Sequence, residues 1–134
     1  ARARRLEESG TVDEVLPDVD TLLGETSRVA RPDVREEVLG WIAEQVPAGL
    51  AWAQRAMAAR PDRTAVLRAF TGPVTIVVGD EDTLSPVALA EQMSVVANGA
   101  PLVVVRGAGH LSAVEDPAAV AAALADLAQR ADAG

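Results

Sequence analysis

Two short runs of apolar, mostly β-branched residues constrain the fold of this chain more than any other feature. Residues 74–78 read Val-Thr-Ile-Val-Val, and residues 102–105 read Leu-Val-Val-Val. Strands that are apolar on both faces belong inside parallel sheets covered by helices. Between the runs, Ser85 as N-cap and Pro86 in the first turn predict a helix with an apolar stripe. The pattern therefore predicts an α/β fold with a right-handed β-α-β unit.

The rest of the chain predicts helices. Residues 1–62 are rich in charge, and apolar residues recur there at helical spacing. Residues 12–23 are expected to form a short helix that Pro17 either breaks or delays to a later start. The other expected helices cover a segment from Pro32 that stops at Pro47, residues 48–60, residues 63–70, and a closing segment from about Asp116 with Pro117 in its first turn. We therefore divide the chain into a helical segment, 1–62, and an α/β segment, 63–134.

Two parallel strands by themselves make a poor sheet. Both strands would expose unpaired backbone groups and long apolar faces to water. The sequence therefore predicts that further strands are supplied by something outside this chain. This expectation follows from the strand pattern and depends on no resemblance.

The composition disfavours several classes of partner and site. The net charge is −8, from 20 acidic and 12 basic residues, which argues against nucleic acid and anionic membranes. The sequence contains no run of about 18 uncharged apolar residues, so no transmembrane helix is predicted. With no cysteine and one histidine, we expect neither disulfides nor a metal site, and no cofactor is implied. We expect a cytoplasmic protein, and the composition is compatible with an oligomer.

The residues that carry chemistry follow the two predicted strands. Asp80-Glu81-Asp82 comes after the first strand, and His110, between glycine-rich and apolar residues, comes after the second. Ligands and catalytic groups in open α/β sheets gather beyond the carboxyl ends of the strands. Histidine can take the proton of a serine hydroxyl, while a carboxylate orients the ring and stabilises the imidazolium. The sequence thus predicts a carboxylate–imidazole pair at one edge of the sheet.

These motifs resemble the C-terminal part of the α/β-hydrolase family. The resemblance lies in Gly79-x-x-Asp82-x-x-x-Pro86, in Gly107-Ala-Gly-His110, and in the helix start Glu115-Asp116-Pro117. It implies that Asp82 is the triad acid and His110 the triad base, in the family's order of Ser, Asp and His. It also implies that residues 1–62 are a helical cap segment and that residues 63–134 hold the last two parallel strands with their helices. Residues 57–63 resemble small esterases of the haloperoxidase (perhydrolase) and 3-oxoadipate enol-lactonase type.

The resemblance implies hydrolysis of a small carboxylic ester or lactone through an acyl-serine. No serine of this chain stands in a G-x-S-x-G context. We therefore expect the nucleophile and the oxyanion hole on a missing N-terminal part of the same protein, and no activity without it. The alternatives are another reaction on the same scaffold (perhydrolysis, C–C hydrolysis or dehalogenation) and a non-catalytic binding module.

Each candidate residue also has a structural interpretation. Acidic residues ahead of a helix favour its dipole, and Asp80 is the alternative to Asp82 as the triad acid. A lone histidine in a loop is often structural. Trp41 and Trp52 either pack within the cap segment or line the pocket for the acyl group, and we retain both as candidate substrate-binding residues.

Overall fold

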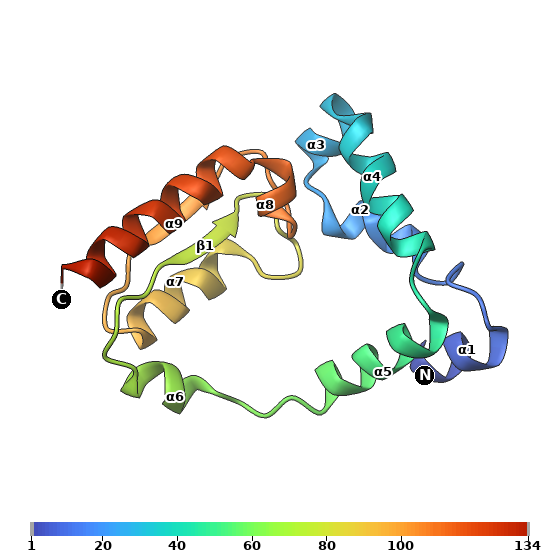
Figure 1. The fold of residues 1–134 in the computed structure, drawn as a ribbon, viewed down its shortest axis with the longest axis horizontal. Coiled ribbons are helices and arrows are strands. Elements are labelled where there is room, and N and C mark those ends of the chain that lie inside the picture. Colours follow the sequence, from blue (N-terminus) through green and yellow to red (C-terminus); the bar gives the residue numbers. More distant parts are fainter. Residues whose placement is uncertain (1, 134) are drawn as a thin grey trace.

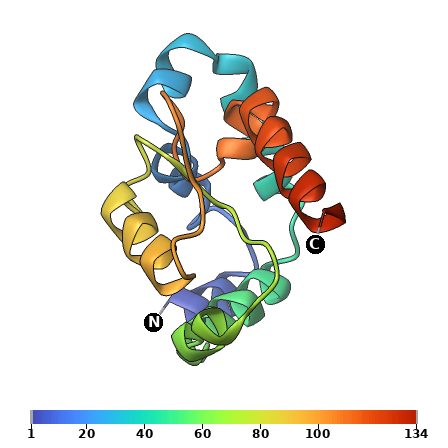
Figure 2. The ribbon, with the colours of Figure 1, turned by 90° about the vertical axis from the view of Figure 1, so that its left-hand side faces the viewer.

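The computed structural model describes residues 2–133 and contains the parallel β-α-β unit that the sequence predicts (Figure 1). Strand β1 (Ile76–Gly79) leads through helix α7 (Val87–Val96) to strand β2 (Leu102–Val105), and the two strands pair in parallel. The closing helix α9 (Pro117–Asp132) lies on the opposite side of the strands from α7 (Figure 2). The predicted α/β architecture of two parallel strands with flanking helices is therefore confirmed.

Small and β-branched side chains form the core of this half of the chain. Ile76 and Val78 of β1 pack with Ala90 of α7 and with Ala97 and Ala100, and all five are buried. Alanines on the helix side let α7 approach the strands closely, so the short strands are well covered on that face. The path of β1 and β2 is thereby fixed, and with it the direction in which both following loops leave the sheet.

Strand β1 and helix α7 both begin later than predicted. Strand β1 begins at Ile76, later than predicted, because the ladder starts where the Ile76 N–H donates to the Pro101 carbonyl. Helix α7 begins at Val87, and Pro86 takes the N-cap position that was assigned to Ser85. The Pro86 backbone is extended, with ψ at 155°, which places this residue outside the helix.

Strand β1 has a strand neighbour on one edge only within residues 2–133. The sheet there has two strands, and β2 is the neighbour of β1. In a parallel strand the backbone groups point alternately to the two edges, so the outer groups of β1 have no strand partner in the described part of the chain. The inference that further strands complete the sheet stays a prediction.

The first half of the chain is helical. Two of its helices, together with the helix that follows residue 63 and the closing helix, begin within one residue of their predicted starts. The elements outside the β-α-β unit and α9 are α1 (Arg2–Ser9), the 3₁₀ turn η1 (Leu16–Asp18), α2 (Val19–Leu22), α3 (Glu25–Ala30), α4 (Pro32–Ala43), α5 (Pro47–Ala58), α6 (Thr64–Ala69) and α8 (Ser112–Glu115). The predicted boundary between residues 62 and 63 lies in the link between α5 and α6.

Within residues 12–23, the structure has the short helix with a late start, which was one of the two predicted outcomes. Pro17 lies in the 3₁₀ turn η1, and regular α-helix begins only at Val19. The chain then turns extended at Leu23, with φ −101° and ψ 145°, and enters α3. Proline has no backbone N–H to continue a helical ladder, which accounts for the interruption, and helices α1, α3 and α8 were not predicted.

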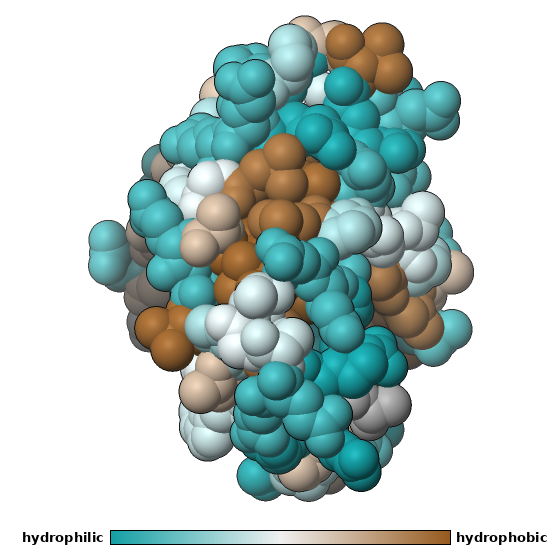
Figure 3. All heavy atoms as spheres, turned by 90° about the vertical axis from the view of Figure 1, so that its right-hand side faces the viewer, coloured by the Kyte–Doolittle hydropathy of each residue, from teal (hydrophilic) through white to brown (hydrophobic). Residues whose placement is uncertain are grey.

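Two apolar clusters hold the helical segment together. Val19 and Leu23 pack with Val34 and Val38 of α4, and Leu6 of α1 packs with residues from the following loop and from α5. Figure 3 shows the outer face of this segment, which is mainly hydrophilic with a group of apolar side chains near its middle. The segment thus has its own interior and also meets the α/β half at the α2–α3 turn.

None of the helices within residues 2–133 combines the length and the apolar character needed to span a bilayer. The same residues contain no group of three or more histidine, cysteine, aspartate or glutamate side chains placed to hold a metal ion.

Candidate active site

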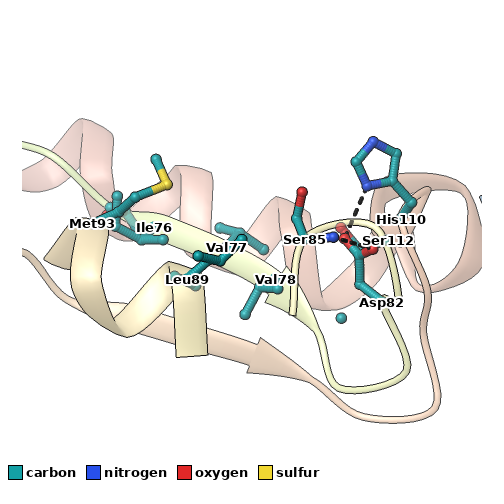
Figure 4. A pocket seen from close by; sticks show the side chains of 12 residues that line it. Ile76, Val77, Val78, Asp82, Ser85, Leu89, Met93, His110 and Ser112 are labelled. Atoms are coloured by element: carbon teal, nitrogen blue, oxygen red, sulfur yellow. Dashed lines mark hydrogen bonds and ion pairs between the residues drawn. The ribbon is translucent and has the colours of Figure 1, made fainter. Parts of the chain in front are cut away.

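The carboxylate of Asp82 and the ring of His110 meet at the carboxyl ends of the two strands. Asp82 Oδ2 lies 2.9 Å from His110 Nδ1 (Figure 4). The Asp82 side chain is 5% exposed and that of His110 is 40% exposed, so a buried acid supports an accessible ring. In Figure 4 the second ring nitrogen points away from Asp82. The expected contact between these two residues is therefore present, while their catalytic roles remain a prediction.

The turn that follows Asp82 fixes its carboxylate. Asp82 Oδ1 accepts hydrogen bonds from the N–H groups of Leu84 at 2.8 Å and Ser85 at 2.9 Å, which leaves Oδ2 for His110. Burial of Asp82 opposes its charged form, but the bonds from Ser85, His110 and Leu84 outweigh burial and hold the pKa of Asp82 below its ordinary value. Because an ionised carboxylate only accepts, Nδ1 of His110 is the donor. A neutral ring then carries its free lone pair on Nε2.

The other two members of the acidic run bind elsewhere. Asp80 Oδ1 accepts from the N–H of Gly107 at 2.6 Å. Glu81 accepts from the N–H and the hydroxyl of Thr26, at 2.8 and 2.6 Å. Each carboxylate of the run thus has a separate partner, and of the two aspartates it is Asp82 that contacts the histidine ring.

The His110 loop is packed backbone to backbone against the end of α2. The N–H groups of His110 and Leu111 both donate to the Leu22 carbonyl, at 2.9 and 3.1 Å. A Cβ on Gly109 would lie 2.6 Å from the carbonyl carbon of Leu23, so only glycine fits there. Gly107 has a φ of +67°, in the region that glycine adopts without strain. These contacts set the position from which the His110 side chain extends.

His110 stands at the junction of two cavities. One, of about 380 Å³, runs along β1 and α7 and is lined by apolar side chains such as Val77, Leu89 and Met93, together with Asp82 and His110 (Figure 4). The other, of about 430 Å³, lies on the side of the helical segment. Its lining comes from α1, the α2 region, α5 and the two loops, namely Arg2, Asp18, Thr21, Leu22, Gln54, Met57, Leu84 and His110.

Comparisons with known proteins identify the family of this chain. A family model described as the alpha/beta hydrolase family matches residues 2–123. The chain belongs to this family. Among solved structures, this chain is similar to a thermophilic esterase from Thermogutta terrifontis with malate bound, at a TM-score of 0.89 and 30% sequence identity. The match covers 96% of this chain and 47% of the esterase, so the chain spans about half the length of that protein. No curated protein sequence matches the chain.

The two tryptophans of the chain line neither of the cavities that reach His110. Trp41 on α4 is 44% exposed and Trp52 on α5 is 70% exposed. Met57, one turn and a residue beyond Trp52 on α5, does line the second cavity. The structure therefore does not bring the tryptophans to the site, and a role for them in substrate binding stays a prediction.

Sequence reasoning missed two groups that shape this site. The Leu22 carbonyl accepts hydrogen bonds from the His110 loop. The carboxylate of Glu115, which belongs to the Glu115-Asp116-Pro117 motif, accepts from the N–H of Gly109. A backbone carbonyl leaves no signature in a sequence. Glu115 was visible only as part of the start of the closing helix, and its partner Gly24 lies 91 residues away in the sequence.

Asp82 makes the stability of the chain depend on pH. Since the folded state lowers the Asp82 pKa, it favours the charged form, and this stabilisation is present above the pH at which free aspartate titrates. It is lost as the pH falls through the folded pKa. We expect the free energy of unfolding to fall on acidification, and Asp82→Asn to remove part of that fall. The remainder comes from other carboxyl groups whose pKa values are lowered, namely Glu7, Asp20, Asp62 and Glu81.

Urea unfolding of the parent chain and of Asp82→Asn, at neutral pH and at successively lower pH, measures this dependence. The asparagine side chain of the variant keeps an oxygen that can accept from Leu84 and Ser85, so the turn is retained. If the two proteins lost stability equally with acid, the assigned environment of Asp82 would be wrong.

Proposed function

We propose that this chain is the C-terminal portion of a serine hydrolase that acts on a small carboxylic ester or lactone, with Asp82 as triad acid and His110 as triad base. The observation that carries the proposal is the 2.9 Å contact between the buried Asp82 carboxylate and Nδ1 of the accessible His110 ring. The contact joins loops that follow two adjacent parallel strands, where catalytic groups gather in such sheets. Family membership and the esterase neighbour support the same interpretation.

The arrangement suits the chemistry of acyl transfer. Nε2 of His110 removes the serine proton as the serine oxygen attacks the ester carbonyl, and Asp82 stabilises the imidazolium that forms. The imidazolium then returns this proton to the departing alcohol, which leaves an acyl-serine. Water, activated by the same nitrogen, attacks the acyl group and releases the carboxylic acid and the free serine. Asp82 stays ionised throughout and holds the ring with Nε2 directed to the reacting atoms.

We assign the serine and the oxyanion hole to an N-terminal part of the same protein. Three observations support this assignment: the chain spans 47% of the esterase, no serine here has a G-x-S-x-G context, and β1 has no strand on its outer edge within residues 2–133. Parallel strands from that part would pair with β1 and place a nucleophile beside Nε2. The apolar cavity along β1 marks the face on which they would pack.

The cavity under the helical segment suits a small substrate. Its volume of about 430 Å³ lies toward the lower end of the range for ligand pockets. Its lining includes Thr21, Gln54 and the Arg2–Asp18 ion pair, whereas the strands of the N-terminal part would fill the apolar cavity beside β1. We propose that residues 1–62 act as a cap over the substrate, in which Trp41 and Trp52 influence substrate choice.

The test of the proposed function compares the 134-residue chain with the full-length protein. The full-length protein should hydrolyse p-nitrophenyl acetate with a burst of p-nitrophenol, the kinetic sign of an acyl-enzyme. The chain alone should show no turnover above background, because it holds the acid and base without a nucleophile. Labelling with a fluorophosphonate, followed by peptide mapping, should locate the reactive serine outside this chain.

Two results would contradict the proposal. One is labelling of Ser85 or Ser112, the serines that line the cavity beside His110. The other is a full-length protein that forms no acyl-enzyme with any short ester or lactone, which would favour the non-catalytic alternative.

A further inference from the structure

Glu115 is a buried carboxylate that the mechanism above does not use. It is the last residue of α8 and is 6% exposed. Its Oε1 accepts from the N–H of Gly109 at 2.8 Å, and its Oε2 accepts from the N–H of Gly24 at 2.8 Å. Burial of a carboxylate is costly unless its oxygens are hydrogen-bonded, and here each oxygen has one backbone donor. The side chain is therefore a two-ended bridge between distant segments.

The two ends of the bridge lie on either side of the boundary between the helical segment and the α/β segment. Gly109 immediately precedes His110, and Gly24 is the N-cap residue of α3. The same two segments are joined by the bonds from His110 and Leu111 to the Leu22 carbonyl. Glu115 thus supports the backbone of the histidine loop from one side while Leu22 holds it from the other.

A third bond fixes the base of the bridge. The guanidinium of Arg31, at the end of α3, donates to the Glu115 carbonyl at 2.9 Å. The helical segment therefore donates hydrogen bonds to both the main chain and the side chain of Glu115. Any shift of the α2–α3 turn is transmitted through the Glu115 carboxylate to the N–H of Gly109, one residue from the ring that contacts Asp82.

We propose that Glu115 is a positioning residue. It holds the His110 ring where Nδ1 can donate to Asp82, and it makes this placement depend on the α2–α3 turn of the helical segment. The placement of the His110 ring can be measured without any catalysis. The consequence for activity rests on the proposed hydrolase function. A small displacement of a catalytic base can cost about 10²-fold in rate, because the reacting atoms must be aligned. Glu115 would then act on kcat without touching substrate.

The variant that tests this proposal is Glu115→Gln, with Glu81→Gln as its matched control. A glutamine at 115 keeps the shape of the side chain but presents one acceptor and one donor, so one of the two N–H groups loses its bond. Glu81 also links α3 to the loop after β1, and the two hydrogen bonds of its side chain go to Thr26 and not to the His110 loop. Glu81→Gln therefore weakens the same junction without touching Gly109.

Proton NMR of the 134-residue chain gives a readout that does not need activity. His110 is the single histidine of the chain, so no other histidine can give rise to a hydrogen-bonded Nδ1–H signal. Glu115→Gln should broaden or abolish this signal and speed amide exchange at Gly109 and His110 by about tenfold or more, as expected when a local hydrogen bond is lost. Glu81→Gln should leave the signal and these exchange rates within about twofold of the parent.

The full-length enzyme supplies the second readout. Glu115→Gln should lower kcat by about 10–100-fold with KM within about twofold, whereas Glu81→Gln should change neither to that extent. Glu115→Asp retains the charge with a shorter reach and should give a smaller loss. If Glu115→Gln does not fold, the same NMR and kinetic comparison is made with Glu115→Asp.

The proposal is overturned if the Glu115 variant keeps the parent's Nδ1–H signal and exchange rates. It is equally overturned if Glu81→Gln disturbs His110 as much, since the effect would then belong to the junction as a whole. An unchanged kcat in an active enzyme whose NMR signal is lost would also refute it. A full-length protein without esterase activity would instead refute the proposed function, and the NMR result would still decide whether Glu115 positions His110.

Discussion

Replacement of His110 by alanine should lower kcat/KM for a small ester by about 10³-fold or more in the full-length enzyme. The ring is the only imidazole of the chain, and its Nδ1 is occupied by the buried Asp82 carboxylate. Alanine removes the group that would accept the serine proton and return it to the leaving alcohol. No neighbouring residue offers another base whose charge changes near neutral pH.

Asp82→Asn should cost a comparable factor for a different reason. The asparagine oxygen can keep the bonds from Leu84 and Ser85, which turns its NH₂ group toward His110 Nδ1. Facing a donor, Nδ1 must become the acceptor, so the proton moves to Nε2. The ring is then held in the tautomer that cannot take a proton from serine, although the loop is intact.

Asp80→Asn is the matched control for Asp82→Asn. Asp80 is two residues away and uses one oxygen to accept from Gly107, which the amide oxygen of asparagine can also do. We expect a loss of less than about tenfold, since no group that contacts the ring is changed. Steady-state kinetics on p-nitrophenyl esters, with circular dichroism of each variant, measure these effects. An active Asp82→Asn enzyme beside an inactive Asp80→Asn enzyme would reverse the assignment of the triad acid.

The elements that the sequence predicted correctly carry their signals locally. Strand β2 occupies the predicted residues 102–105, and α9 begins at Pro117 with the Asp116 carboxylate accepting from the N–H of Ala119. Proline in the first turn and an aspartate N-cap act within four residues. The start of β1 was predicted less well because its ladder depends on where the partner strand begins. That information lies more than twenty residues further along the chain.

The parts of the site that sequence reasoning missed depend on contacts over long separations. Glu115 binds Gly24 across 91 residues, and the Leu22 carbonyl receives the N–H of His110 from the other half of the chain. Periodicity predicted a short helix within residues 12–23, broken or delayed at Pro17, but it did not predict the bend that brings Leu22 and Gly24 to the histidine loop. The contact of Asp82 with His110 was predictable because adjacent parallel strands bring their following loops together.

Gly109→Ala should destabilise the chain by about 1–3 kcal/mol, the usual cost of forcing extra atoms into a packed site. A Cβ at this position would lie 2.6 Å from the carbonyl carbon of Leu23 and closer still to the backbone nitrogen of Gly24. Both are main-chain atoms, so no side-chain rotation can relieve the overlap. The His110 loop and the α2–α3 turn must separate, which also strains the bonds to Leu22 and Glu115.

Gly40→Ala provides a control in which the same substitution should have the opposite sign. Gly40 lies inside α4, and a Cβ there meets nothing within 4 Å. Because glycine loses more backbone freedom than alanine when a helix forms, this variant should gain about 0.5–1 kcal/mol. Urea unfolding of the two variants and the parent gives both differences in free energy. If Gly109→Ala unfolded at the parent's urea concentration and kept the His110 Nδ1–H signal, the two segments could not be in the close backbone contact on which the placement of His110 depends.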